Sequence, residues 1–117
     1  PTQVREDLLR AEDALARAID ISPTLYRPPY GVLTTAALAH ASRRGWKPLL
    51  WTRWGRDWRA GATAATIAAE ATTGLRGGDV ILLHDADHYS AHGSWERTVL
   101  ALPCILERAG EAGLTFV

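Results

Sequence analysis

The sequence has little of several residue types, and each scarcity excludes a class of protein. A single cysteine, Cys104, among 117 residues rules out an internal disulfide and any metal site built from several thiolates. Lysine plus arginine and aspartate plus glutamate are equal at 13 each, so the charge does not indicate a nucleic acid or an anionic membrane as partner. No apolar run approaches the roughly 20 residues that a membrane-spanning helix requires. With 47% hydrophobic residues, the composition is that of a chain with a packed core.

Methionine is also absent, and the sequence opens on a helical pattern with no strand before it. Thr2 is expected to cap a helix over about residues 3–20, because apolar residues recur there at helical spacing. These two features lead us to expect that the chain is one part of a longer protein. No signal peptide is visible, and a preceding segment would have carried one.

Turn residues divide the remainder into alternating strand and helix patterns. The expected strands cover 25–26, 47–52, 80–83 and 114–117. One expected helix starts at Thr34 or Thr35 and runs to residue 44, the next is capped by Thr63 and runs to about residue 73, and the last is capped by Ser94 and runs to about residue 109, with a kink or a start at Pro103. Strict alternation of this kind predicts an α/β fold, a parallel sheet with helices outside it. Four strands cannot close a barrel, which again indicates part of a larger domain.

The strand that ends at His84 is the most informative stretch. Val80-Ile81-Leu82-Leu83 follows two glycines and Asp79, a pattern that predicts a strand buried on both faces. A histidine at the carboxyl end of such a strand lies where parallel sheets place their chemistry. The strand alone is equally consistent with a histidine that only caps it through nearby backbone groups.

Two other expected strands are also followed by polar residues. The prolines of Arg27-Pro28-Pro29-Tyr30-Gly31 predict a rigid loop that presents an arginine and a tyrosine, or else a stiff turn with a stacked arginine. Asp57 and Trp58 lie in a loop rich in tryptophan and arginine, a composition suited to stacking on sugar rings. Right-handed crossovers place the strand ends on one rim, so we expect Arg27, Asp57 and His84 to form one site.

The loop over residues 86–93 carries a further group of titratable side chains. Asp87, His88 and His92 lie there, and their spacing matches no standard metal-ligand pattern. We therefore predict no metal site in this loop.

In this order, Arg27-Pro28-Pro29-Tyr30-Gly31, Asp57-Trp58 and Leu82-Leu83-His84 resemble the third, fourth and fifth motifs of the NodB-type polysaccharide deacetylases, carbohydrate esterase family 4. The segments 98–103 and 114–117 are similar to that family's last helix and strand. The resemblance implies that residues 1–117 are the carboxyl-terminal part of a single deacetylase domain, a deformed (β/α) barrel of the NodB/glycoside hydrolase–deacetylase type. It also implies metal-dependent hydrolysis of N-acetyl or O-acetyl groups on a carbohydrate polymer.

The resemblance implies catalytic roles for three residues. His84 matches the general acid that protonates the leaving amine. Asp57 matches the acid that partners this histidine and keeps its imidazolium form available near neutral pH. Arg27 matches the arginine that orients the catalytic carboxylate.

Three further residues match positions that contact the substrate. Tyr30 corresponds to the tyrosine whose backbone N–H helps to bind the oxyanion. Trp58 corresponds to the groove wall, and Leu82 to the pocket for the acetyl methyl group. The implied partner is thus a carbohydrate.

The family's first motif, a pair of aspartates, and its second, a His-x-x-x-His, have no counterpart ahead of the first helix, where the family places them. We expect zinc or a similar divalent metal in the complete domain, held by a preceding segment, and no metal ligand in this chain. The isolated chain is accordingly predicted to bind no catalytic zinc and to be inactive. Zinc-dependent acetate release by the purified chain would refute this.

Two other functions remain open on the sequence alone. The chain could be a non-catalytic carbohydrate-binding protein. Sugar binding that a metal chelator does not change would favour this function. It could also be a remnant that associates with itself through open sheet edges, which light scattering would detect. The substrate is open among chitin, peptidoglycan, xylan and smaller amides, and an extracellular or cell-envelope location follows from the family alone.

Overall fold

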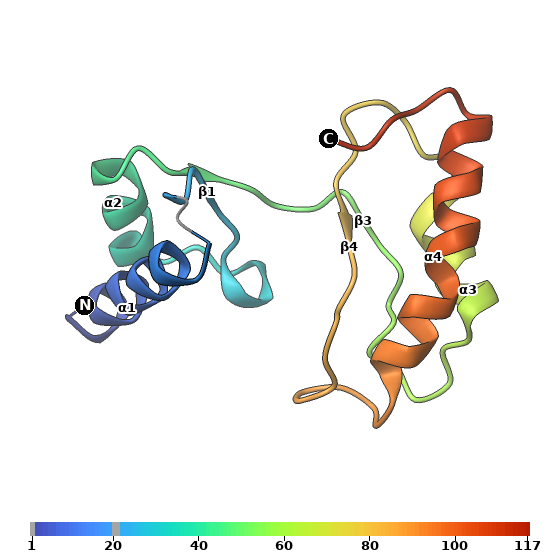
Figure 1. Cartoon of the computed structure of the whole chain (residues 1–117), viewed down its shortest axis with the longest axis horizontal. Helices are drawn as coiled ribbons and strands as arrows, with labels where there is room; N and C mark the ends of the chain where they lie inside the picture. Colours follow the sequence, from blue (N-terminus) through green and yellow to red (C-terminus); the bar gives the residue numbers. More distant parts are fainter. Residues whose placement is uncertain (1, 20–21) are drawn as a thin grey trace. The chain divides into compact units, whose positions relative to one another are not determined.

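The computed structural model describes residues 2–19 and 22–117. The chain divides into two compact units, Pro1–Leu50 and Trp51–Val117, and each is described by itself. Figure 1 labels the elements of both units. The predicted end of the first helix, Asp20, lies outside the described residues.

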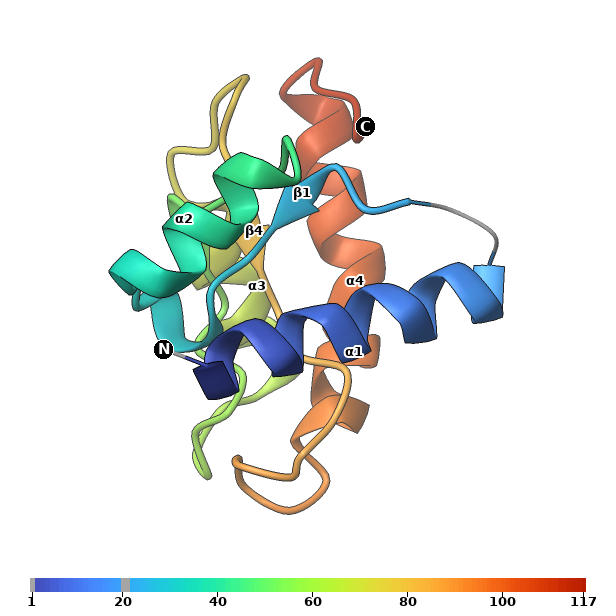
Figure 2. The ribbon, with the colours of Figure 1, turned by 90° about the vertical axis from the view of Figure 1, so that its left-hand side faces the viewer.

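The first unit contains the helices α1 (Thr2–Ile19) and α2 (Thr35–Arg43) and the short strands β1 (Leu25–Tyr26) and β2 (Lys47–Pro48). The strands are parallel, with Leu25 opposite Lys47 and Tyr26 opposite Pro48. Helix α1 packs against α2, as Figure 2 shows. The buried core of this unit consists of Tyr26, Ala37, Ala41 and Trp46, with Val4 and Leu8 of α1 packed against it.

The predicted bounds of both helices are close to the observed ones. Thr34 caps α2, because its Oγ1 accepts a hydrogen bond from the N–H of Ala37 at 3.2 Å. Gly45 ends the helix in a left-handed conformation with φ 71°. Thr2 is itself helical in α1, so its predicted role as the residue before the helix is wrong.

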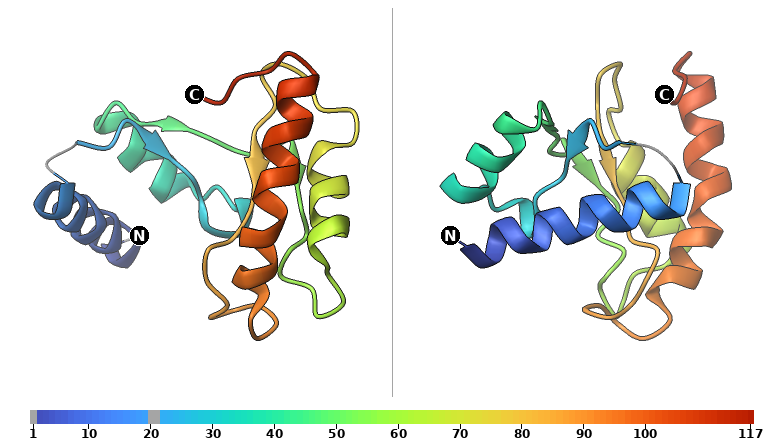
Figure 3. Two further views of the ribbon diagram at one scale, coloured as in Figure 1. Left: turned by 45° about the vertical axis from the view of Figure 1, so that its right-hand side comes forward. Right: turned by 60° about the vertical axis from the view of Figure 1, so that its left-hand side comes forward.

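The second unit contains β3 (Arg53–Trp54), α3 (Ala64–Thr72), β4 (Ile81–Leu82) and α4 (Ser94–Glu111). Strands β3 and β4 are parallel, and α3 and α4 lie side by side (Figures 1 and 3). The buried core of this unit consists of Ile67, Ala68, Ala71, Ala101 and Ile105, with Ile81, Leu83 and Cys104 packed against it. The α/β class and the parallel pairing follow the prediction. The single sheet and the strict alternation do not, because β1–β2 and β3–β4 are separate two-stranded sheets and β3 follows β2 with no helix between them.

The two helices of this unit differ in how they begin. Thr63 and Thr66 form a reciprocal capping box at the start of α3, as the threonine at this position predicted. Helix α4 is capped by Gly93 and not by Ser94, which is already its first helical residue. Pro103 lies inside α4 and does not mark its start.

Three strand predictions need correction. The strand expected over 47–52 is only the two-residue strand β2, which pairs with β1; residues 49–52 lie in no strand, and β3 begins after them at Arg53 and pairs with β4 instead. At the start of β3 the N–H groups of Thr52 and Arg53 both donate to the Val80 carbonyl, at 3.0 and 3.1 Å. The strand before His84 is only two residues long and is half-buried. Residues 114–117 form no strand, because the N–H of Leu114 donates to the Ala109 carbonyl at 2.9 Å and closes the end of α4 instead.

Within the described residues, no helix combines the length and the apolar character needed to cross a bilayer.

Candidate active site

The segment after β3 sets the position of Asp57. Gly55 lies against the core, where a Cβ would come within 2.7 Å of both Ile67 Cγ2 and Leu83 Cδ2. The next residue, Arg56, has a left-handed backbone with φ 49°, which is costly for a residue with a side chain. After this turn Asp57 is buried, with 1% of its surface exposed.

Asp57 contacts His84 through both carboxylate oxygens. Oδ2 accepts a hydrogen bond from the backbone N–H of His84 at 2.6 Å, and Oδ1 lies 2.9 Å from the ring Nδ1. With Asp57 as a carboxylate, which only accepts, we assign the ring proton to Nδ1, and Nε2 is then the nitrogen left for a ligand. The His84 side chain is 36% exposed, so the ring reaches the surface while its partner stays buried. This is the geometry of an oriented general acid or base.

A third donor to Asp57 comes from α4. Thr98 Oγ1 donates to Asp57 Oδ2 at 2.8 Å, and Thr98 is itself 5% exposed. The carboxylate is therefore buried with three hydrogen-bond donors, which offsets the cost of removing it from water. The sequence did not reveal this residue, because one threonine in an amphipathic helix carries no signal of its own.

Trp58 joins the site from the residue after Asp57. Its ring meets the His84 ring edge to face, with centroids 5.7 Å apart and an interplanar angle of 84°. Its carbonyl accepts from the N–H of Ala91 at 3.0 Å. The loop from His84 to Ala91 is thus held at its first residue by Asp57 and at its last by Trp58.

Asp87, in the middle of this loop, bonds to the backbone two residues beyond the loop's end. Its Oδ2 accepts from the N–H of Gly93 at 2.8 Å. This hydrogen bond outweighs the raising effect of partial burial and, with smaller contributions from its own backbone N–H and from the nearby histidines, lowers the pKa of Asp87 below its ordinary value.

Leu82 lies in β4, two residues before His84. It is half-buried, stands opposite Trp54 in the register of the two strands, and accepts from the N–H of Gly55 at 3.3 Å. The second unit therefore brings together three of the predicted site residues, Asp57, Trp58 and His84, and places Leu82 two residues earlier on the strand that leads to His84.

Arg27 and Tyr30 lie in the first unit, directly after β1. Tyr30 has a left-handed backbone with φ 55°, and its side chain is 80% exposed. The turn is held by the buried Pro28, whose carbonyl accepts from the N–H of the glycine after Tyr30 at 3.1 Å. The chain turns at the two prolines as predicted, while the rigidity of the loop and the expected meeting of Arg27 with Asp57 and His84 stay predictions.

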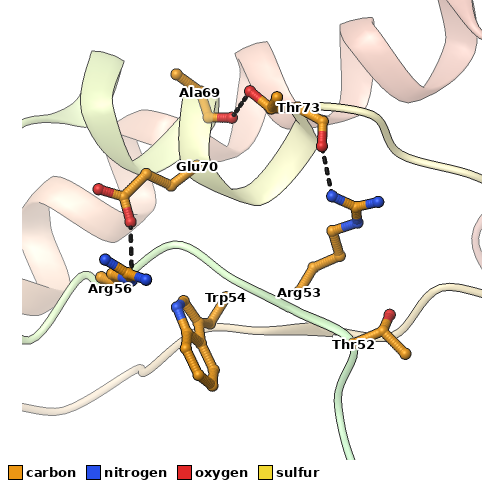
Figure 4. Close-up of a pocket in the computed structure, with 7 residues that line it drawn as sticks. All are labelled: Thr52, Arg53, Trp54, Arg56, Ala69, Glu70 and Thr73. Atoms are coloured by element: carbon orange, nitrogen blue, oxygen red, sulfur yellow. Dashed lines mark hydrogen bonds and ion pairs between the residues drawn. The ribbon is translucent and has the colours of Figure 1, made fainter.

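A pocket of about 540 Å³ lies between β3 and α3 (Figure 4). It is lined by Thr52, Arg53, Trp54, Arg56, Ala69, Glu70 and Thr73. Arg56 Nε lies 3.2 Å from Glu70 Oε2, and the guanidinium carbon lies 5.6 Å from the centre of the Trp54 ring. Arg53 donates to the carbonyl of Thr73 at the end of α3. These contacts hold β3, and the turn that follows it, against α3.

Asp79 fixes the start of β4. It accepts hydrogen bonds from Thr52 Oγ1 at 2.7 Å, from the N–H of Arg76 at 2.9 Å and from Arg53 Nε at 3.0 Å. These contacts, that of Thr52 first, lower the pKa of Asp79 from 3.8 to about 2. The network ties the approach to β3 to the approach to β4 and so keeps the two strand ends in register.

The described residues do not fit the metal that the resemblance implies. Among residues 2–19 and 22–117, no three or more His, Cys, Asp or Glu side chains are grouped so that they could hold an ion. The Nδ1 of His84 is engaged by Asp57, and Asp87 is engaged by a backbone amide. The chemistry available in this unit is that of the Asp57–His84 pair.

Several known proteins resemble this chain in sequence or in structure. The family model for polysaccharide deacetylases matches residues 1–49. A bifunctional xylanase/xylan deacetylase of Cellvibrio japonicus is 37% identical over 92 residues, and a peptidoglycan-N-acetylglucosamine deacetylase of Bacillus cereus is 33% identical over 98. A family 4 carbohydrate esterase from Streptomyces lividans has a TM-score of 0.80 at 28% identity. The chain is related to the polysaccharide deacetylases of carbohydrate esterase family 4.

The match to the family 4 deacetylases covers most of this chain and part of each relative. It takes in 79% of the chain and 14% of the Cellvibrio protein, and 81% of the chain and 43% of the Bacillus protein. For the Streptomyces structure the shares are 97% and 54%. The predicted resemblance is confirmed, and the chain corresponds to about half or less of each of these proteins.

Proposed function

We propose that this chain forms the acid side of the active site of a hydrolase that removes N-acetyl or O-acetyl groups from a carbohydrate polymer. The observation that carries the proposal is the Asp57–His84 pair, in which a buried carboxylate orients an imidazole whose Nε2 is left for a ligand. Relatives that are deacetylases of xylan and of peptidoglycan support this substrate class. Residues 1–117 are then part of one deacetylase domain, the carboxyl-terminal portion of a deformed (β/α) barrel.

The chemistry assigned to His84 is protonation of the leaving group. Hydrolysis of an acetamide adds water to the carbonyl carbon and breaks the bond from that carbon to the sugar nitrogen, which must gain a proton to leave as an amine. The His84 imidazolium donates this proton from Nε2, while the proton on Nδ1 stays in the hydrogen bond to Asp57. The products are acetate and the free amino sugar, and an ester releases an alcohol by the same step.

Four other residues have proposed roles. Trp58 forms a wall beside His84, and Leu82 receives the acetyl methyl group. The backbone N–H of Tyr30 binds the oxyanion, and Arg27 orients the catalytic carboxylate. The left-handed backbone of Tyr30 supports its role, because strain of this kind concentrates at functional positions.

The proposal for the complete domain includes a divalent metal, zinc or a similar ion, that polarises the acetyl carbonyl and activates water. Its ligands are not found among the described residues of this chain. A polymer such as peptidoglycan or xylan lies outside the cytoplasm, so the proposed location is extracellular or in the cell envelope.

The test is acetate release by the full-length protein carrying His84→Ala. Because a positioned general acid contributes roughly 10² to 10⁴ in rate, we expect a fall of that size in acetate release from a protein that remains folded. The matched control is His92→Ala, an exposed histidine of the following loop, which should retain activity. Retained activity in His84→Ala would show that the assigned role is wrong.

A further inference from the structure

Thr98 is the one side chain outside the His84 segment that donates to Asp57 in the described part of the chain. It lies in α4, separated by 41 positions from Asp57, and its Oγ1 is 2.8 Å from Asp57 Oδ2. Both residues are almost fully buried, at 5% and 1% exposed. Water therefore has little access to replace this hydrogen bond if it is removed.

The two oxygens of Asp57 have separate partners. Oδ2 accepts from both the backbone N–H of His84 and Thr98 Oγ1, and Oδ1 faces only the ring nitrogen of His84. Two donors on Oδ2 fix the rotation of the carboxylate about its Cβ–Cγ bond. This rotation decides whether Oδ1 lies in the plane and direction of the Nδ1–H group.

We propose that Thr98 is a positioning residue for the general acid, acting on His84 through Asp57. The effect of Thr98 on catalysis rests on the proposed function. Its effect on the Asp57–His84 contact does not depend on that function. The hydrogen-bond partners of its hydroxyl are Asp57 and the Ser94 carbonyl, and neither is a residue assigned to the substrate.

The hydroxyl has a second acceptor within reach. The carbonyl of Ser94, one turn earlier in α4, lies 3.3 Å from Thr98 Oγ1. A hydroxyl has one proton, and the shorter contact to a carboxylate is the stronger one, so the proton is assigned to Asp57. The Ser94 carbonyl also accepts a hydrogen bond within the helix, so it does not need the Thr98 proton, which can be donated to Asp57.

The closing experiment compares Thr98→Val, which removes the hydroxyl and keeps the shape, with Thr98→Ser, which keeps the hydroxyl. Ser94→Ala is the matched control, because Ser94 Oγ is buried on the same helix with no hydrogen-bond partner in the part of the chain that the structure describes. The first readout is the proton signal of His84 Nδ1 in the ¹H–¹⁵N spectrum of the histidine-labelled 117-residue chain. Thr98→Val should shift or broaden this signal, and Thr98→Ser and Ser94→Ala should preserve it.

The second readout is turnover by the full-length protein. Thr98→Val should lower kcat on the order of tenfold with KM unchanged, since general-acid catalysis is worth roughly 10² to 10⁴ in rate and the acid is misaligned but present. Thr98→Ser should restore most of the loss. An unchanged Nδ1 signal in Thr98→Val, or a Thr98→Ser variant as impaired as Thr98→Val, would overturn the inference.

The two readouts separate this inference from the proposed function. If His84→Ala retains activity while Thr98→Val still disturbs the Nδ1 signal, the catalytic assignment fails and the positioning contact stands. If His84→Ala abolishes turnover while Thr98→Val leaves the Nδ1 signal and kcat unchanged, the positioning role of Thr98 is wrong and the proposed function of His84 stands. Should Thr98→Val not fold, Thr98→Ala against Thr98→Ser makes the same comparison without an added methyl group.

Discussion

Asp57 contacts the backbone and the side chain of His84 at the same time. One carboxylate oxygen accepts from the His84 amide at 2.6 Å, and the other lies 2.9 Å from the ring Nδ1. The ring orientation is therefore set relative to the backbone of its own residue, and the exposed edge of the imidazole does not depend on a rotamer preference alone. Such an arrangement keeps Nε2 in place before a substrate arrives, which reduces the reorganisation that catalysis would otherwise require.

This contact predicts the effect of Asp57→Asn. An asparagine that keeps its amide oxygen toward the His84 N–H and Thr98 directs its NH₂ group at the His84 ring, so Nδ1 must accept and the ring proton moves to Nε2. The substitution also replaces three bonds to a charged carboxylate by weaker bonds to a neutral amide. We expect a loss of about 1–3 kcal/mol in the free energy of unfolding, together with lost turnover. Asp85→Asn changes an exposed carboxylate beside His84 and should stay within about 0.5 kcal/mol of the wild type in urea titrations. Equal stability of the two variants would contradict the buried contact.

Gly55 gives a packing prediction. Gly55→Ala places a methyl group 2.7 Å from two core side chains, so we expect a loss of about 1–3 kcal/mol from overpacking and a displaced Asp57. Gly61→Ala is the matched control, because a Cβ there meets nothing within 4 Å. Thermal unfolding of both variants decides the matter: a Gly55→Ala protein as stable as Gly61→Ala would show that the close approach at Gly55 is absent.

Asp79 predicts a dependence of stability on pH. Its pKa in the folded chain is lowered from 3.8 to about 2, so its hydrogen bonds favour the charged form. The contribution to stability is present above pH 3.8 and is lost as the pH falls through that value toward 2. Urea unfolding of the wild type between these limits should therefore show a decline that is smaller in Asp79→Asn. A decline of the same size in both would mean that other carboxylates account for it.

Much of the helical structure could be predicted from the sequence, because helix ends carry local signals. Thr34 and Thr63 cap the helices that they were expected to cap, and Gly45 ends one of them with a positive φ. That Asp57 and His84 lie at one rim was also predictable, since both follow strands in an α/β chain, while their direct pairing was implied by the family resemblance. These inferences need only short segments and the rule that parallel strands end at the same edge.

The remaining features depend on contacts between distant segments. The expected strand over 47–52 is cut short because the chain pairs with β1 at Lys47–Pro48 and next with β4 at Arg53–Trp54, a change of partner that no local pattern encodes. The last four residues have a strand-like composition, yet Leu114 bonds back to the end of α4. Thr98 looks like any polar residue of an amphipathic helix until the fold places its hydroxyl beside a buried carboxylate.

The loop that follows His84 has a further consequence. Its first residue is bonded to Asp57 and its last, Ala91, to the carbonyl of Trp58, so two consecutive residues of another segment hold both of its ends. Lengthening a loop with fixed ends costs little, because the entropy of closure grows only slowly with length. The middle of the loop, where Tyr89 is 89% exposed, is thus a place where sequence can be exchanged between relatives, or grafted by design, while the acid beside it stays where it is.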